Sequence, residues 1–139
     1  MVLDMIAVAS EGQIAAGRFV LRPVRRSDEG LVSLYAGDKR VAEATHSIPH
    51  PLPPGAAEAF VMRAMAGKSD EDIWVMDGSS TGLPEVLGVI NLKRMDRAQS
   101  EIGFWVAPAF WNTGFASEAV QALVAANPHK DRTIFAEVF

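Results

Sequence analysis

The chain has 139 residues, 49% of them hydrophobic and 22% charged, which is typical of one globular domain with a single core. The net charge of −4 disfavours non-specific nucleic-acid binding, and the absence of cysteine excludes disulfides, thiolate metal sites and a cysteine nucleophile. No apolar run approaches the length of a membrane span, and Asp4 stands where a signal peptide carries basic residues, so we expect a cytoplasmic protein.

The first half of the chain predicts a strand followed by helices. Residues 1–17 are weakly patterned and are expected to form a tail or an extra edge strand, ahead of a domain spanning 18–139. The segment Phe19–Val24 is short and rich in β-formers, which predicts a strand. Capping residues and apolar periodicity then predict helices over 27–37, 38–44 and 54–66, with a proline-rich connector over 48–54.

The second half predicts three meandering strands, one helix and a last strand. The strands are expected at 72–77, 85–93 and 99–106, the helix ends near Ala126, and an almost wholly apolar strand covers 133–139. A strand that follows a crossover helix pairs in parallel with the strand before that helix. This order predicts a mixed α/β (α+β) domain with a mostly antiparallel central sheet and flanking helices.

Two groups of polar residues have a structural interpretation. The four arginines between residues 18 and 26 are interpreted as a solvated basic rim, because strand alternation sends their side chains in different directions. Pro49 breaks any helix that would align His46 with His50, and His129 lies in a predicted turn. We therefore interpret the three histidines as solvated or capping residues and expect no metal site.

The segment 99–126 combines a strand, a glycine-bearing turn and an amphipathic helix. Along the strand, Ile102, Phe104 and Val106 point to one face, and Glu101, Gly103 and Trp105 to the other. Gly103 leaves room for the close approach of a ligand or another backbone. Pro108 has no N–H and ends regular pairing, so a splayed strand would leave amides free for an extended amide-containing ligand.

The turn 111–116 leads directly into the helix. Asn112 or Thr113 can cap this helix, and Gly114 lets the backbone approach a ligand. The N–H groups of the first turn and the helix dipole favour a diphosphate, and no acidic side chain lies between Pro108 and Ser117. A single glycine at a helix start also occurs in α/β domains that bind no phosphate, so the spacing alone leaves both interpretations open.

Three segments resemble the GNAT superfamily of acyl-CoA N-acyltransferases, and within it the branch of the ribosomal-protein N-terminal acetyltransferases. They read RFVLRPVRRSD, VLGVINLKR and SEIGFWVAPAFWNTGFASEAV, and the resemblance spans about Arg18 to Phe139. The family's phosphate signature is Gln or Arg, two variable residues, Gly, one variable residue, then Gly or Ala. Tryptophan in the first place, here Trp111, is usual for this branch. Asn112 departs from a common glycine, and Thr113 stands where a basic residue is frequent.

The resemblance implies an N-acetyltransferase that uses acetyl-CoA as cosubstrate and no metal. Amides of the strand would hold pantetheine and polarise the thioester carbonyl, and the turn would hold the diphosphate. The implied cofactor-binding residues are Phe104, Trp105 and Val106 on the strand, then Trp111, Asn112, Thr113, Gly114, Phe115, Ala116 and Ser117.

The resemblance also implies direct attack of the acceptor amine on the acetyl carbon. Glu101 is the candidate base, acting through water; the alternative is a cross-strand or surface carboxylate that only orients the acceptor or pairs with an arginine. Asn91 on the neighbouring strand is a candidate for lining the acceptor pocket, or else a polar position facing solvent.

Family members continue beyond the strand that 133–139 matches, and the expected fold therefore lacks a last helix and two strands. The apolar terminal strand would have an unpaired edge, which predicts a homodimer through this region. Two functions stay open. One is an acetyl-CoA-dependent N-acetyltransferase acting on a primary amine of a protein N-terminus or a small molecule, and the other is a catalytically inactive CoA-binding remnant or interaction module.

Overall fold

The computed structural model describes residues 12–45, 47–67 and 70–136. The strands are β1 (Ile14–Ala15), β2 (Val20–Pro23), β3 (Glu71–Asp77), β4 (Gly88–Met95), β5 (Gln99–Val106) and β6 (Thr133–Ala136). The helices are α2 (Glu29–Ala36), α3 (Lys39–Thr45), α4 (Ala56–Ala66) and α5 (Phe115–Ala126), with short 3₁₀ turns at Arg26–Asp28, Ser79–Thr81 and Pro108–Phe110. None of the described helices is long and apolar enough to cross a membrane.

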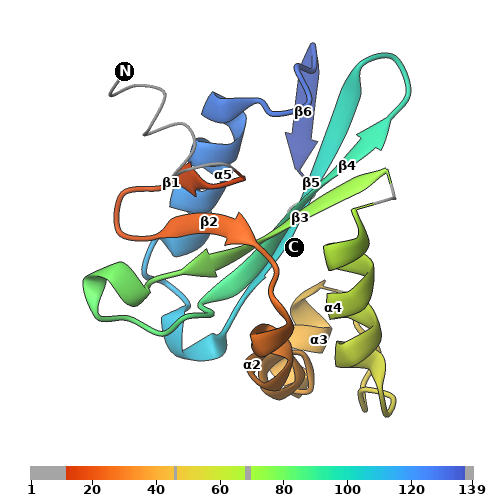
Figure 1. Cartoon of the computed structure of the whole chain (residues 1–139), viewed down its shortest axis with the longest axis vertical. Coiled ribbons are helices and arrows are strands. Elements are labelled where there is room, and N and C mark those ends of the chain that lie inside the picture. The colour runs from red at the N-terminus through yellow and green to blue at the C-terminus, as the bar shows by residue number, and fades with distance from the viewer. Residues whose placement is uncertain (1–11, 46, 68–69, 137–139) are drawn as a thin grey trace.

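The six strands form one sheet in the order β1-β2-β3-β4-β5-β6 (Figure 1). The first five strands are antiparallel to their neighbours, whereas β6 runs parallel to β5. Helix α5 makes the crossover between these two parallel strands. The predicted mixed fold and its single parallel crossover are therefore confirmed.

The sheet carries a core on each face. Helix α5 packs on one face against Leu92 and Ile102, and α4 packs on the other face with Val61 against Val75. The predicted alternation of β5 is confirmed, because Ile102, Phe104 and Val106 belong to the α5 side and Trp105 to the α4 side.

The first residues of the predicted strand 85–93, which corresponds to β4, lie in a loop. The carbonyl oxygen of Glu85 accepts a hydrogen bond from Arg22 Nη2 (3.2 Å) and so does not join the sheet. Ladder pairing with β3 starts only at Gly88, and it continues to Lys93. Residues 1–11 of the predicted tail and 137–139 of the predicted terminal strand lie outside the described residues.

The interpretation of the arginine cluster as a solvated rim is wrong for Arg22, which is 1% exposed. Its Nε donates to Asp77 (2.6 Å), and both terminal nitrogens donate to Asp28 (2.9 and 2.7 Å). Strand alternation points Arg22 to the side covered by α2, where two buried carboxylates compensate its charge. Arg18 and Arg25, in contrast, are exposed.

Candidate active site

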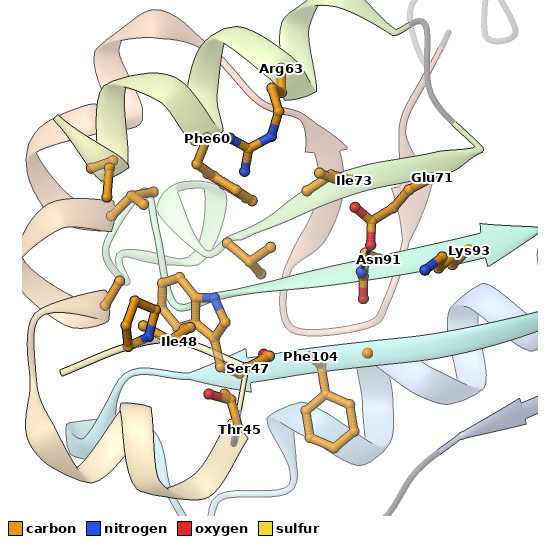
Figure 2. Close-up of a pocket in the computed structure, with 18 of the residues that line it drawn as sticks. Thr45, Ser47, Ile48, Phe60, Arg63, Glu71, Ile73, Asn91, Lys93 and Phe104 are labelled. Carbon is orange, nitrogen blue, oxygen red and sulfur yellow. Dashed lines mark hydrogen bonds between the residues drawn. The ribbon is translucent and has the colours of Figure 1, made fainter. Parts of the chain in front are cut away.

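A cavity of about 490 Å³ lies between the sheet and the segments that cover its α4 face (Figure 2). Its apolar end is lined by side chains from α2, α4, β5 and the connector after α3: Val32, Ile48, Leu52, Phe60 and Trp105. Its polar end is lined by Glu71, Asn91, Lys93 and Glu101, and Arg63 reaches from α4 into the cavity beside Phe60. The size and the mixture of apolar walls with a few polar groups are those of a small-molecule site.

The polar end is built by strand register. Glu71, Lys93 and Glu101 are directly paired residues on β3, β4 and β5, so they form one row across the sheet. Asn91 lies in the next row on the same face, and its Nδ2 donates a hydrogen bond to Glu71 Oε2. The carboxylate of Glu101 forms no hydrogen bond or ion pair with any described residue.

Gly103 faces this cavity directly opposite Asn91. A Cβ atom on Gly103 would lie 2.5 Å from the Asn91 Oδ1 atom. The space that a Cβ atom would take is filled by the Asn91 side chain, and Gly103 itself still lines the cavity. Because cross-strand neighbours lie so close, the glycine lets Asn91 lean over β5.

The main-chain groups of β5 point alternately to its two edges. Ala107 donates its N–H toward β4 (2.8 Å), and Ala98 accepts a hydrogen bond from the β6 side (2.8 Å). Because successive residues point their main-chain groups to opposite edges, those of Phe104 and Val106 point to the β6 edge. Those of Trp105 point to β4, and its side chain lines the cavity instead.

Among the described residues, the pairing of β5 with β6 ends at Ile102 and Ala136. The edge of β5 beyond this point carries the main-chain groups of Phe104 and Val106. The Val106 carbonyl accepts a hydrogen bond from Trp111 Nε1 (2.7 Å), which ties the following turn to the end of the strand.

The turn before α5 places a glycine at the N-cap. Gly114 has φ +83° and caps the helix without a side-chain hydrogen bond, so the expectation that Asn112 or Thr113 caps it is wrong. The Thr113 hydroxyl donates instead to the carbonyl of Phe110. Asn112 also has a positive φ of 62°, so the turn holds two left-handed residues, Asn112 and Gly114. No side chain caps the first N–H groups of α5.

Arg18, which the sequence predicts only as part of a solvated basic rim, supports this turn. Its Nη2 donates to the Thr113 carbonyl (2.6 Å), its Nε pairs with Glu118 (2.7 Å), and its guanidinium lies 4.2 Å from the centre of the Phe115 ring. Glu118 belongs to the first turn of α5, so Arg18 neutralises the carboxylate nearest to the helix start. Arg18 and Thr113 are 95 residues apart, and no local pattern could connect them.

His129 is not solvated, contrary to the expectation from its turn position. Its side chain is 2% exposed; Nε2 lies 2.5 Å from Asp72 Oδ2 and Nδ1 lies 3.1 Å from the Ser100 hydroxyl. Ser100 is fully buried on the α5 side of the sheet, so this cluster fixes the chain after α5 to the sheet and offers no accessible nucleophile. Within the described ranges no group of three or more His, Asp or Glu residues could hold a metal ion.

The family of the chain follows from comparison with known proteins. A model of the acetyltransferase (GNAT) domain matches residues 18–137, and the chain therefore belongs to this family of N-acetyltransferase enzymes. No curated protein matches the sequence.

Solved structures show the same fold. An acetyltransferase (GNAT family) from Bacillus anthracis is 26% identical, with 89% of this chain and 72% of that chain covered and a TM-score of 0.70. RimL, a ribosomal L7/L12 α-N-protein acetyltransferase, is 17% identical, with 85% and 65% covered and a TM-score of 0.65. The microcin C7 self-immunity acetyltransferase MccE, solved with acetyl-CoA and AMP, is 15% identical, with 78% and 62% covered and a TM-score of 0.61. The chain thus spans between 62% and 72% of the length of these three proteins.

Proposed function

We propose that this protein is a cytoplasmic acetyltransferase that moves the acetyl group of acetyl-CoA to a primary amine. The observation that carries the proposal is the unpaired carboxylate of Glu101, which lines the cavity three and five residues before Phe104 and Val106, whose main-chain groups face the edge of β5. A deprotonating group and a carbonyl-binding strand edge are thus parts of one strand. Acetyl transfer to an amine requires both.

Acetyl-CoA supplies an acetyl thioester and an extended amide-containing arm. The edge-facing main-chain groups of Phe104 and the N–H of Val106 suit that arm, and an edge N–H can donate to the thioester oxygen. The amides from 112 to 117 suit the diphosphate, because α5 begins with uncapped N–H groups and a positive dipole end. Trp111 holds this turn against the strand through Val106.

Glu101 accepts a proton from the acceptor ammonium, directly or through one water, so that a neutral amine reaches the acetyl carbon. The new N–C bond forms as the C–S bond breaks, and the sulfur leaves as the thiol with the proton that the amine loses. Asn91 faces the same cavity and is held by Glu71, so it presents its Oδ1 atom beside Gly103 toward the acceptor.

The test compares Glu101→Gln with the wild type. We expect the rate of thiol release to fall roughly 100-fold or more, while the affinity for acetyl-CoA measured by calorimetry is unchanged. Glu58→Gln is the matched control, because Glu58 is an exposed α4 residue outside this cavity. Binding of acetyl-CoA without thiol release, across a panel of amines, would instead identify a CoA-binding remnant or interaction module.

We also propose that two copies associate through β6. Among the described residues this edge strand pairs only with β5, and it carries Phe135 at 40% exposure. Light scattering at micromolar concentration tests this association. A dimer that Phe135→Glu converts into a folded monomer is the expected result, and a wild-type monomer contradicts the proposal.

A further inference from the structure

We propose that the acceptor is an α-amino acid with an apolar side chain and a free carboxylate. This inference rests on the proposed acetyl transfer and names the substrate class of the same cavity. It is drawn from three charged side chains that line the cavity, Arg63, Lys93 and Glu101, and from the apolar surface at its other end.

The polar end offers charges of both signs that have no partner in the described structure. Lys93 and Glu101 lie directly opposite each other on β4 and β5, yet they form no ion pair with each other or with any other described residue. Arg63 is likewise without an ion pair, and Figure 2 shows its guanidinium pointing from α4 toward the cavity. Glu71, in contrast, accepts a hydrogen bond from Asn91.

This arrangement complements a zwitterion. Glu101 can receive the ammonium group, which is also the group to be deprotonated, and one of the two cations of the cavity, Lys93 or Arg63, can receive the carboxylate through charge-assisted hydrogen bonds. A peptide N-terminus would bring an uncharged carbonyl group to this place. Lys93 and Arg63 are exposed in the structure, and a peptide would offer neither cation a charged partner, which favours a free amino acid over a peptide.

The apolar end of the cavity determines which kind of side chain the amino acid should carry. Ile48, Leu52, Phe60 and Trp105 lie along a single cavity with the polar groups. An aliphatic or aromatic side chain attached to the zwitterionic group would displace water from these walls. A small side chain would leave these walls in contact with water, and a charged side chain would bury its charge against them.

The experiment measures binding and transfer separately with a matched set of acceptors: L-leucine, L-alanine, 3-methylbutylamine and leucyl-glycyl-glycine. Calorimetry with CoA present gives affinities, and thiol release from acetyl-CoA gives kcat/KM. We expect leucine to exceed each of the other three by about tenfold or more in both quantities. Arg63→Gln or Lys93→Gln should abolish the advantage of leucine over 3-methylbutylamine, which lacks only the carboxylate.

Arg94→Gln is the control, because Arg94 is an exposed neighbour of Lys93 on β4 and does not line the cavity. Equal use of leucine and 3-methylbutylamine, or preference for the tripeptide, overturns the inference while acetyl transfer stands. Preferential leucine binding without thiol release supports the ligand class and overturns the proposed transfer. No binding of any acceptor and no thiol release overturns both.

Discussion

Removal of the Arg22 guanidinium should be the most destabilising single change at a position away from the cavity. All five N–H groups of Arg22 donate hydrogen bonds: Nε to Asp77, and the two terminal nitrogens to Asp28 and to the carbonyls of Pro23 and Glu85. Arg22→Leu leaves two buried carboxylates without their cation. Breaking a buried ion pair in this way costs about 3–5 kcal/mol, a large part of the ~5–15 kcal/mol that stabilises a domain.

The assay is thermal and urea unfolding followed by circular dichroism. For a domain of this size we expect the midpoint temperature of Arg22→Leu to fall by roughly 10–20 °C. Arg25→Leu is the matched control, because Arg25 is 53% exposed and lies 3.6 Å from Asp77. An exposed pair contributes no more than about 1 kcal/mol, so this variant should unfold close to the wild type.

The pH dependence gives a second, independent readout. Burial alone would raise the pKa of Asp77, but hydrogen bonds from Ser79 and Arg22 outweigh burial and hold this pKa below its ordinary value. A carboxyl whose pKa is lowered on folding adds stability above its unfolded pKa of about 3.9, and this stability is lost as the pH falls through the folded pKa. The difference between wild type and Arg22→Leu should therefore shrink as the pH falls from 7, because the buried carboxyls of the variant take up protons more readily than those of the wild type, and it should be smallest below about pH 4. A difference under about 1 kcal/mol at pH 7, or one that does not shrink in acid, would refute this reasoning.

Three further predictions concern the turn before α5 and the chain after it. Gly114→Ala forces a side chain into a left-handed conformation with φ +83°, so we expect a loss of about 1–2 kcal/mol in unfolding free energy and weaker acetyl-CoA binding by calorimetry. Arg18→Gln should raise the KM for acetyl-CoA and leave the KM for the amine unchanged, because Arg18 braces the turn and lies outside the cavity; equal shifts in both constants would exclude this role. His129→Ala leaves Asp72 and Ser100 without their buried partner and should lower the urea stability by about 1–3 kcal/mol with kcat unchanged, whereas a fall in kcat alone would place His129 in the reaction.

The order of elements and the two faces of β5 could be predicted from the sequence because they depend on local patterns. Apolar alternation sends Ile102 and Trp105 to opposite faces whatever covers them, and Pro108 ends the strand because proline has no N–H. The crossover of α5 follows from the order of the last three elements and the handedness of such connections. The family signature over 111–116 is likewise continuous in the chain.

The partners of the charged residues were decided only by the tertiary structure. Arg22 and Asp77 are 55 residues apart, His129 and Asp72 are 57 apart, and strand pairing and crossover connections bring them together. The register between β4 and β5 placed Asn91 over Gly103, where the sequence suggested room for a ligand. A side chain that is polar and isolated in the sequence can be buried once its counter-charge arrives from another strand, because the pair can then be desolvated together. Local patterns therefore identified which segments form the candidate site, and long-range packing decided which of its charges remain free for a substrate.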